Sequence, residues 1–546
     1  MNWIDFQQLP DTAGGFSDLF LDYIINFEMV QKFYATNFRN NRSYESVIND
    51  ISTRQPDRAS VAEALTEQNR HFGSPASTFE HINLLAQANT FAVVTGQQVG
   101  LFGGPLYTVF KTITAVKLAF RLKEIFPEHN FVPVFWIEGE DHDFAEMNHV
   151  NLLDRENAAV NVSYLPGGAL PERNLGPIGE LTFDGSLEAT YKQVSDTLPK
   201  TEFTDPLLHR LKGCYAPGRT FNEAFVSWMN FLFAEQGLVF ISANHPRLKR
   251  LLSPLFVKEL SEFPSISQMV ITQSAELEGE YHAQIKAKSI NLFLFHKGGR
   301  YLIEPREHDF SLKGTRHFLS GEELLAIARD TPELLSTNVI LRPIAQDMLL
   351  PTVAYVAGPS EVAYHAQLRP VYEALGMVQP VVYPRASASF VEERLVRAME
   401  KYDLQVADFF GDINRVTARV VEQISEVKVD DIFGTTTKRV HDAMNELRFG
   451  LKEIDQTLLG ALDGVIAKID TNIGVLREKS VAAQKRRNDV AVRQIEKAAQ
   501  GILPNGSLQE REISILYYMN KYGPDLVGGL LQKLDINGFK HQLLTQ

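Results

Sequence analysis

A long uncharged stretch near residue 100 predicts a strand, a turn and a helix. No Asp, Glu, Lys or Arg lies between Glu80 and Lys111. Within it, residues 91–95 form a short apolar run of the kind found in fully buried strands. From Pro105 onward, apolar residues recur at helical spacing, and a second apolar run follows at 131–137. The pattern predicts a right-handed βαβ unit of a parallel sheet.

This stretch does not read as a membrane span. A span needs about 20 continuous apolar residues. Here Gln97 and Gln98 lie in the middle, and several glycines and Pro105 interrupt the run. A spanning backbone tolerates such breaks only when neighbouring segments satisfy it. We therefore expect a buried element with a tight turn and no membrane association.

The alternation of strand and helix signals continues to about residue 390. Further short apolar runs predict strands at 238–241, 269–271, 291–295, 352–356 and 381–383. Glycine or proline turns and helical patterns follow the last two. Such repetition favours an α/β fold, an open doubly wound core over residues 1–390. We expect insertions at about 152–235 and 275–345, where this order is interrupted.

Beyond residue 390 the pattern changes to long helices. Residues 391–505 predict a helical coiled-coil arm, and residues 506–546 predict helices that pack back on the core. The apolar positions of the arm are Ile454, Leu458, Leu462, Val465, Ile469, Ile473 and Leu476. Their spacing repeats every 11 residues, about 3.67 per turn, which predicts a nearly straight arm. We expect residues 478–500 to return as its antiparallel partner and the arm to form a homodimer; a hairpin within one chain is the alternative.

Composition narrows the class of protein. The 546 residues include 54 Lys and Arg against 67 Asp and Glu, a net charge of −13, so we expect no nucleic-acid partner. Cys214 is the only cysteine, which excludes an intramolecular disulfide and a cysteine-rich metal site. The N-terminus lacks a basic start followed by an apolar core. We expect a cytoplasmic protein.

A dense polar cluster follows the predicted strand at 131–137. Its members are Glu138, Glu140, Asp141, His142, Asp143, Glu146 and His149, with Asn148 beside them. The cluster has three interpretations: ligands of a divalent metal, bases that hold an amine, or a cap of the next helix. Because the H-E-x-x-H spacing of zinc sites is absent, we favour polar contacts to a substrate and predict no metal site.

Polar residues also follow the two later strands. The segment after 352–356 offers Gly358, Ser360, Glu361, Tyr364 and Gln367 at the start of a helix. The segment after 381–383 offers Arg385, Ser387 and Ser389, which suit a phosphate or a carboxylate. Helix capping by the serines is compatible with that role.

The turn after residues 91–95 is the third candidate. Glycines let backbone N–H groups approach a phosphate at a helix N-terminus. The candidate residues here are Thr95, Gly96, Gln97, Gln98, Gly100, Gly103, Gly104, Tyr107 and Lys111. The pattern matches neither G-x-G-x-x-G nor the P-loop, so close packing of helix on strand, with no ligand, is the alternative.

Several of these segments together resemble one known family. They are "TGQQVGLFGGPLYTVFKTITAVKLA", "PVFWIEGEDHDFAEMNHV", "AGPSEVAYHAQL", "YPRASASFVEERL" and "LQEREISILYYMNKYG". The chain resembles the cysteine ligases of bacillithiol biosynthesis from its N-terminal region to its last helices. The resemblance implies a Rossmann-like core related to class I aminoacyl-tRNA synthetases, connecting-peptide insertions and a dimerising coiled-coil arm. It also implies that L-cysteine is joined to glucosaminyl-malate.

An amide bond formed in water needs an activated carboxylate, for which ATP with Mg²⁺ is the expected agent. In this hypothesis the glycine turn binds phosphate, and Arg385 pairs with the malate carboxylates. Glu140, Asp141, His142 and Asp143 are the catalytic candidates, with Asp141 and His142 holding or deprotonating the amine. Two alternatives remain: a metal-dependent hydrolase that uses the "EDHD" cluster, and a non-catalytic coiled-coil scaffold.

Overall fold

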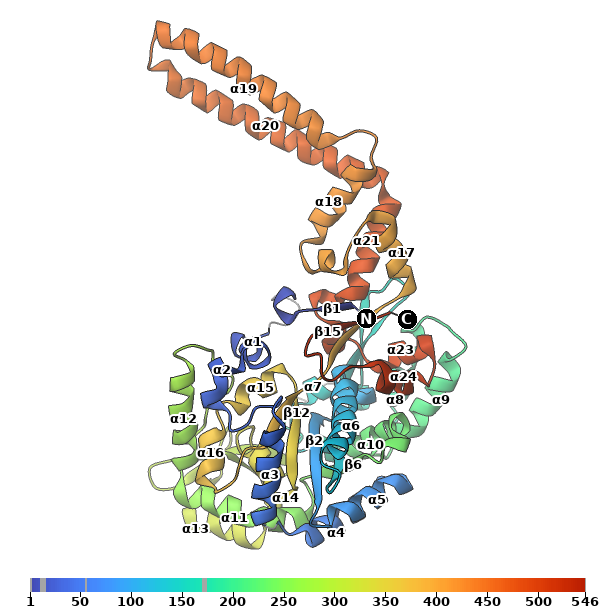
Figure 1. Ribbon diagram of the computed structural model, residues 1–546, viewed down its shortest axis with the longest axis vertical. Coiled ribbons are helices and arrows are strands. Elements are labelled where there is room, and N and C mark those ends of the chain that lie inside the picture. Colours follow the sequence, from blue (N-terminus) through green and yellow to red (C-terminus); the bar gives the residue numbers. More distant parts are fainter. Residues whose placement is uncertain (1, 10–15, 55, 169–173, 546) are drawn as a thin grey trace. The chain divides into compact units, whose positions relative to one another are not determined.

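A five-stranded parallel sheet organises the larger part of the molecule. The computed structural model describes residues 2–9, 16–54, 56–168 and 174–545. The strand order is β13-β12-β2-β3-β6 and all four neighbouring pairs are parallel (Figure 1). The strands are β2 (Thr90–Gln98), β3 (Asn130–Glu138), β6 (Val239–Ser242), β12 (Thr352–Ala357) and β13 (Val381–Pro384). The chain builds outward from β2 in both directions, which is the doubly wound topology the sequence predicts.

The βαβ unit predicted from the uncharged stretch is confirmed. Helix α6 (Tyr107–Ile125) joins β2 to β3 and packs on β2, β3 and β12. Its apolar face is buried throughout, and so are the interiors of β2 and β3. Burial of this kind stabilises by roughly 25 cal/mol per Å² of apolar surface. This burial accounts for the apolar character of the stretch. Among the described residues, no helix is both long enough and apolar enough to cross a bilayer.

Helices and short strands complete this unit. The N-terminal helices are α1 (Asp18–Ile25), α2 (Phe27–Val30), α3 (Asn41–Arg54), α4 (Arg58–His71) and α5 (Ala76–Leu85). After β3 come α7 (Phe144–Met147), β4 (His149–Leu153), β5 (Ala159–Ser163), α8 (Leu187–Thr197), α9 (Thr204–Cys214) and α10 (Phe221–Leu232). Later helices are α11 (Pro246–Glu262), α12 (Ser265–Leu277), α13 (Gly321–Asp330), α14 (Leu341–Leu349), α15 (Pro359–His365) and α16 (Arg369–Ala374).

A second, antiparallel sheet fills the region between α12 and α14. Its order is β10-β9-β8-β7-β11. The strands are β7 (Leu292–His296), β8 (Gly299–Pro305), β9 (Phe310–Leu312), β10 (Phe318–Leu319) and β11 (Leu335–Thr337). The run at 291–295 is therefore a strand, as predicted, but it belongs to this sheet and not to the parallel core.

One predicted strand is wrong. Residues 269–271 lie within α12, where Ile266, Val270 and Leu277 are buried at helical spacing. Three consecutive apolar residues cannot distinguish the two structures, because a run this short fits one face of a helix as well as a strand.

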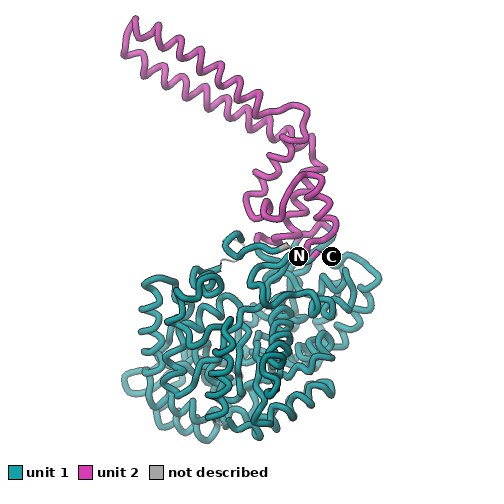
Figure 2. The backbone as a smooth tube through the Cα atoms, viewed as in Figure 1, with its two compact units in different colours: residues 1–155, 159–389, 507–544 teal, residues 156–158, 390–506, 545–546 magenta. Residues whose placement is uncertain are grey.

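The chain divides into two compact units. The first comprises residues 1–155, 159–389 and 507–544, and the second comprises 156–158, 390–506 and 545–546 (Figure 2). The C-terminal elements are α22 (Gln509–Glu512), α23 (Ile515–Tyr522), α24 (Leu526–Lys533) and β15 (His541–Thr545). Strand β15 lies between β1 (Asn2–Ile4) and β14 (Ser387–Val391) in a three-stranded sheet.

The second unit is helical. It contains α17 (Glu393–Tyr402), α18 (Ile413–Ile424), α19 (Val429–Ile454), α20 (Leu458–Arg487) and α21 (Asp489–Ile502). Helices α19 and α20 pack on each other as a hairpin. The predicted partner at 478–500 is wrong, because α20 continues to Arg487 and its partner α19 precedes it. The predicted 11-residue pattern crosses the turn at 455–457. Its first residue, Ile454, ends α19, and its other residues belong to α20.

The glycine turn between β2 and α6 generates the first prediction. Gly103 has φ +90°, and a Cβ there would lie 2.8 Å from Trp228 Cδ1. Its N–H donates to the Tyr215 hydroxyl at 3.0 Å. Gly103→Ala should lower the free energy of unfolding by roughly 2 to 4 kcal/mol, from the left-handed backbone and the overpacking. Denaturant unfolding would measure this loss.

Gly185→Ala is the matched control, because nothing lies within 4 Å of a Cβ at Gly185. It should change the free energy of unfolding by less than about 0.5 kcal/mol. Equal stability of the two variants would contradict the assignment of Gly103 to packing.

Candidate functional site

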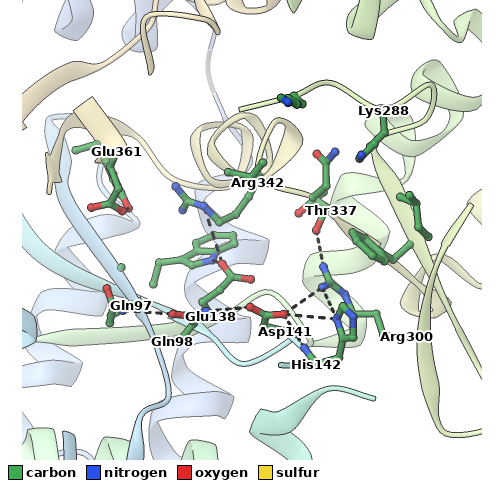
Figure 3. Close-up of a pocket in the computed structure, with 18 residues that line it drawn as sticks. Gln97, Gln98, Glu138, Asp141, His142, Lys288, Arg300, Thr337, Arg342 and Glu361 are labelled. Carbon is green, nitrogen blue, oxygen red and sulfur yellow. Dashed lines mark hydrogen bonds and ion pairs between the residues drawn. The ribbon is translucent and has the colours of Figure 1, made fainter. Parts of the chain in front are cut away.

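A cavity of about 460 Å³ opens at the carboxyl ends of the central strands. In an open α/β sheet, ligands bind there, at the point where the strand order reverses. That point lies between β2 and β12. The wall is formed by Gly96, Gln97, Gln98, Trp136, Glu138, Asp141, His142, Lys286, Lys288, Phe293, Arg300, Leu302, Thr337, Asn338, Val339, Arg342, Tyr355 and Glu361 (Figure 3).

Asp141 is a carboxylate of the wall held by several donors. Its Oδ2 accepts from Gln98 Nε2 at 3.0 Å, and its Oδ1 accepts from the backbone N–H of His142 at 2.7 Å. The His142 ring and Arg300 Nη1 lie 3.5 and 3.7 Å from Oδ1. Burial alone would raise the pKa of Asp141, but these bonds and Arg300 outweigh it and hold the pKa well below its usual range. Asp141 is therefore a permanent anion.

Glu138 lies on the same wall and behaves in the opposite way. Its Oε2 accepts from Trp136 Nε1 at 3.1 Å, and Arg342 Nε lies 4.0 Å away (Figure 3). Burial raises the pKa of Glu138 to about 7; Arg342 offsets part of the effect, while Glu140 adds to it. The side chain is still 23% exposed. A carboxyl group with this pKa at a cavity wall can accept a proton near neutral pH.

A buried lysine joins the ends of β2 and β12. Lys111 is 2% exposed, and its Nζ donates to the Gly96 carbonyl at 2.5 Å and lies 2.6 Å from Glu361 Oε2. Glu361 also accepts from the Tyr355 hydroxyl at 2.7 Å and from the Gly358 N–H at 2.6 Å. Burial lowers the pKa of Lys111, and Glu361 opposes the shift. The pair orders the wall from behind.

Several predicted residues therefore meet at one site. Those that line the cavity are Gly96, Gln97, Gln98, Asp141, His142 and Glu361. Tyr107, Lys111, Gly358 and Tyr364 stand directly behind them. The Tyr107 hydroxyl bonds Gln97 at 3.2 Å, and the Tyr364 hydroxyl accepts from Arg342 at 3.0 Å.

Other members of the "EDHD" segment have structural partners. Glu140 forms a buried ion pair with Lys249 of α11, whose Nζ also donates to the Leu335 carbonyl at 2.6 Å. Asp143 caps α7 by accepting from the Glu146 N–H at 3.3 Å. Cap and cavity wall thus coexist in one segment, as the alternatives for this cluster allowed.

The remaining predicted residues are placed away from the cavity. Thr95 donates to the Val356 carbonyl, Asn148 donates to the Tyr164 carbonyl, and His149 bonds the Ala145 carbonyl. Ser360 is exposed on α15. Gly100, Gly103 and Gly104 pack against protein: a Cβ at Gly100 would lie 2.9 Å from the Gly104 Cα. Gln367 is buried and bonds the backbone of Ile285.

Arg385, Ser387 and Ser389 form a separate buried cluster. Arg385 Nη2 lies 2.7 Å from Glu510 Oε1, and Ser387 donates to Glu510 Oε2 at 2.9 Å. The His541 ring lies between Ser387 and Ser389, at 2.8 and 3.0 Å. Since Glu510 is 0% exposed, the Arg385 guanidinium serves this ion pair and is not presented to the cavity.

Sequence reasoning did not find the cations of the wall. Arg300 comes from β8, Arg342 from α14, and Lys286 and Lys288 from the loop after α12. None of them stands at the end of a parallel strand, so strand-end polarity gave no signal for them. These cations reach the cavity because the inserted segments fold next to the ends of the parallel strands, which the sequence pattern does not reveal.

The arrangement defines a class of protein: an α/β enzyme of the doubly wound type, with a charged cavity at the carboxyl ends of its parallel strands. Within the described ranges, no group of three or more His, Cys, Asp or Glu could hold a metal ion.

Comparison with known proteins identifies the family. Residues 4–386 match the model "Bacillithiol biosynthesis BshC, N-terminal Rossmann-like domain", and residues 388–546 match "Bacillithiol biosynthesis BshC, C-terminal coiled-coil domain". The chain belongs to the BshC family of bacillithiol biosynthesis, a family of ligases, and this confirms the resemblance and the Rossmann-like fold.

Relatives named "Putative cysteine ligase BshC" match along nearly the whole chain. The protein of Salinibacter ruber is 37% identical over 98% of this chain and 97% of its own. The protein of Chlorobaculum tepidum is 37% identical over 97% of both chains. A relative from Geobacillus sp. is 30% identical over 94% of both chains.

Proposed function

We propose that the protein adds L-cysteine to the amine of glucosaminyl-malate through an amide bond, in bacillithiol biosynthesis. The observation that carries this proposal is the match to the ligase family over both domains. The cavity supports it, because one wall carries a permanent anion and a carboxyl group able to accept a proton. Those are the groups that binding and deprotonating an amine require.

Activation of the cysteine carboxylate is assigned to ATP. When bound, ATP supplies the phosphoryl or adenylyl group that makes the carboxyl carbon reactive. The glycine turn does not fit a phosphate, because its space is occupied by Trp228 and its Gly103 N–H is bonded to Tyr215. The positive charge needed to bind phosphate is instead assigned to the cations that line the cavity, namely Lys286, Lys288, Arg300 and Arg342. Mg²⁺ would enter with the nucleotide, since it is commonly held by phosphates with one or two carboxylates.

Asp141 and Glu138 have different roles toward the amine. Asp141 stays ionised, so it holds the amine by charge and hydrogen bonding but is a weak base. Glu138 Oε1 has no hydrogen bond among the described residues, and its pKa matches the task of a general base. The amine nitrogen attacks the activated carboxyl carbon, the carbon–nitrogen bond forms, the phosphate or AMP leaves with its bonding electrons, and Glu138 takes the amine proton.

The first prediction here concerns the reaction itself. Purified protein with glucosaminyl-malate, L-cysteine, ATP and Mg²⁺ should form bacillithiol, detected by thiol labelling and mass spectrometry. AMP with pyrophosphate would indicate an adenylate, and ADP with phosphate would indicate an acyl phosphate. Product formed without nucleotide consumption would refute direct activation by ATP. No product with any donor would remove the support for the ligation.

The second prediction concerns pH. Because Glu138 is protonated below about pH 7, kcat at saturating substrate should rise with pH through this value and then level off. Glu138→Gln should lower kcat by roughly 10²- to 10⁴-fold and abolish that rise. Arg342→Gln should move the rise to higher pH, because Arg342 lowers the pKa of Glu138.

Glu146→Gln is the control for this profile. Glu146 accepts from Gln98 Nε2 at 2.7 Å, the group that also donates to Asp141. Glu146 is not among the residues that line the cavity. It should keep both the rate, within a few-fold, and the pH at which kcat rises. If Glu138→Gln kept the rise instead, the base would be another group.

We also propose that the arm forms a homodimer. The hairpin seam already contains buried Leu462 and half-buried Ile466, Ile469 and Ile473 of α20. Beside it, Leu458, Val465 and Leu476 remain 38, 48 and 57% exposed. Their spacings of 7 and 11 residues are close to whole helical turns, so they form one row. A second copy is the partner proposed to cover this row.

The third prediction tests that row. Val465→Lys with Leu476→Lys should dissociate the dimer, weakening association at least 100-fold, since each buried apolar side chain is worth roughly 1.5 to 3 kcal/mol. Sedimentation measures the mass, and circular dichroism confirms that the helices persist. Phe449→Lys is the control: Phe449 of α19 is 76% exposed and is not part of the row on α20. Dissociation by the control alone would place the interface on the other face.

A further inference from the structure

The charges that line the cavity do not balance within the wall. Three carboxylates (Glu138, Asp141 and Glu361) face four cations (Lys286, Lys288, Arg300 and Arg342). Glu361 is neutralised from behind by Lys111 at 2.6 Å. Asp141 lies 3.7 Å from Arg300, and Glu138 lies 4.0 Å from Arg342. Each carboxylate therefore has a cation beside it. No carboxylate of the wall remains as a partner for Lys286 or Lys288.

The two arginines are already engaged with protein groups. Arg300 donates to the Ser336 hydroxyl and the Thr337 carbonyl, both at 2.8 Å, and stacks 3.9 Å above the Phe293 ring. Arg342 donates to Gln346 at 3.2 Å and to Tyr364. By contrast, the ammonium groups of Lys286 and Lys288 make no hydrogen bond or ion pair within the residues that the structure describes. Both side chains are exposed.

The loop that carries the lysines is nevertheless held in place on both sides. Gln367 Oε1 accepts from the Ile285 N–H at 3.0 Å, and Gln367 Nε2 donates to the Ile285 carbonyl at 2.8 Å and to Ser274 at 2.7 Å. The Ser267 hydroxyl donates to the Lys288 carbonyl. Gln367 and Ser267 are 0 and 1% exposed. The backbone of the lysines is therefore positioned by buried groups, while the charges stay free.

Figure 3 shows where one of these charges lies. Lys288 lies on the side of the cavity that carries Thr337 and Arg300, while Glu361 and Gln97 lie across from it. The cavity thus offers two carboxyl groups to a cation or amine, Glu138 and Asp141, and an edge at Lys288 where the free charge is positive. Lysine is a flexible point charge that binds phosphates and carboxylates without a fixed geometry.

We propose that Lys286 and Lys288 bind a group of the substrate that carries two negative charges. This inference rests on the proposed function, which offers two sources of such a group: the malate end of the sugar and the phosphates of the nucleotide. In either case the lysines replace partners that the sequence suggested, because Arg385 is paired with buried Glu510 and the glycine turn is filled by Trp228.

Direct binding tests this assignment without turnover. Titration calorimetry at low salt would use glucosaminyl-malate and ATP separately, each with the full chain. Lys286→Ala with Lys288→Ala should lose at least about tenfold in affinity for one of the probes, the equivalent of one charge-assisted hydrogen bond. Lys286→Arg with Lys288→Arg should keep most of the affinity, because the charge is retained. Raising the salt should weaken the wild type more than the alanine variant.

A matched control removes two other charges from the same region. Lys297→Ala with Lys313→Ala alters two exposed lysines of the inserted sheet that do not line the cavity, and it should bind both probes like the wild type. A loss for glucosaminyl-malate alone assigns the lysines to malate, and a loss for ATP alone assigns them to phosphate.

Two results would overturn the assignment. If the alanine variant binds both probes like the control while the wild type forms product, the lysines are not the anion site and the ligase function stands. If the wild type binds neither probe, no such site exists, and the proposed function fails with it.

Discussion

The contact of Lys111 with Gly96 and Glu361 is the constraint on which the site depends. It joins the end of β2 to the helix that follows β12, across the point where the strand order reverses. An ammonium group this buried is costly without partners. Both partners must therefore stay in place, and with them the backbone of Gly96 to Gln98 and the N-terminus of α15. A buried ion pair adds little net stability, but it specifies one arrangement of the wall.

That fixed wall explains why two neighbouring carboxylates have opposite properties. Burial raises the pKa of both, but N–H donors and Arg300 outweigh it at Asp141, whereas Glu138 has a single arginine 4.0 Å away and other carboxylates nearby. Each negative charge lowers the tendency of the other to ionise. Asp141 takes the charge because it has more donors, and Glu138 is left with a pKa about 7. Both carboxyl groups belong to the end of β3, and their different pKa values follow from the donors around each: Asp141 accepts from Gln98 and the His142 N–H, and Glu138 accepts, among the described residues, from Trp136 alone.

Much of the fold could be predicted from the sequence, because its signals are local. The run at 91–95, the helix after Pro105 and the run at 131–137 each show their own periodicity, and α6 with its two strands follows. The helical character of the arm was also visible, but the two helices of its hairpin were not: Ile454 and Leu458 are four apart, as in one helix, although three residues of turn separate them. The antiparallel sheet of the insertion depends on pairing between distant segments, for which short apolar runs give no register.

The candidate site was predictable only where a strand ends. Asp141, His142, Gln97 and Gln98 were found because polar residues directly after a buried strand are informative by themselves. Gly103 shows the limit of this reasoning: a ligand and a tryptophan ring both require the absence of a Cβ, so the residue type cannot distinguish them. Arg385 shows another limit, since its partner Glu510 lies 125 residues further along the chain. Whether an arginine is free for a substrate depends on such a partner and not on its own position.

The division of labour in the site follows from the same distinction. The parallel core supplies the two carboxyl groups proposed to handle the amine, Glu138 and Asp141, at the end of β3, a strand paired on both sides. The inserted segments supply Arg300, which is spent on orienting Asp141, and two lysines whose charges remain open. Groups that must act on a reacting atom need positions fixed to a fraction of an ångström, and the core provides them. Recognition of a charged substituent tolerates the reach of a lysine side chain, so a loop anchored only through its backbone is sufficient for that task.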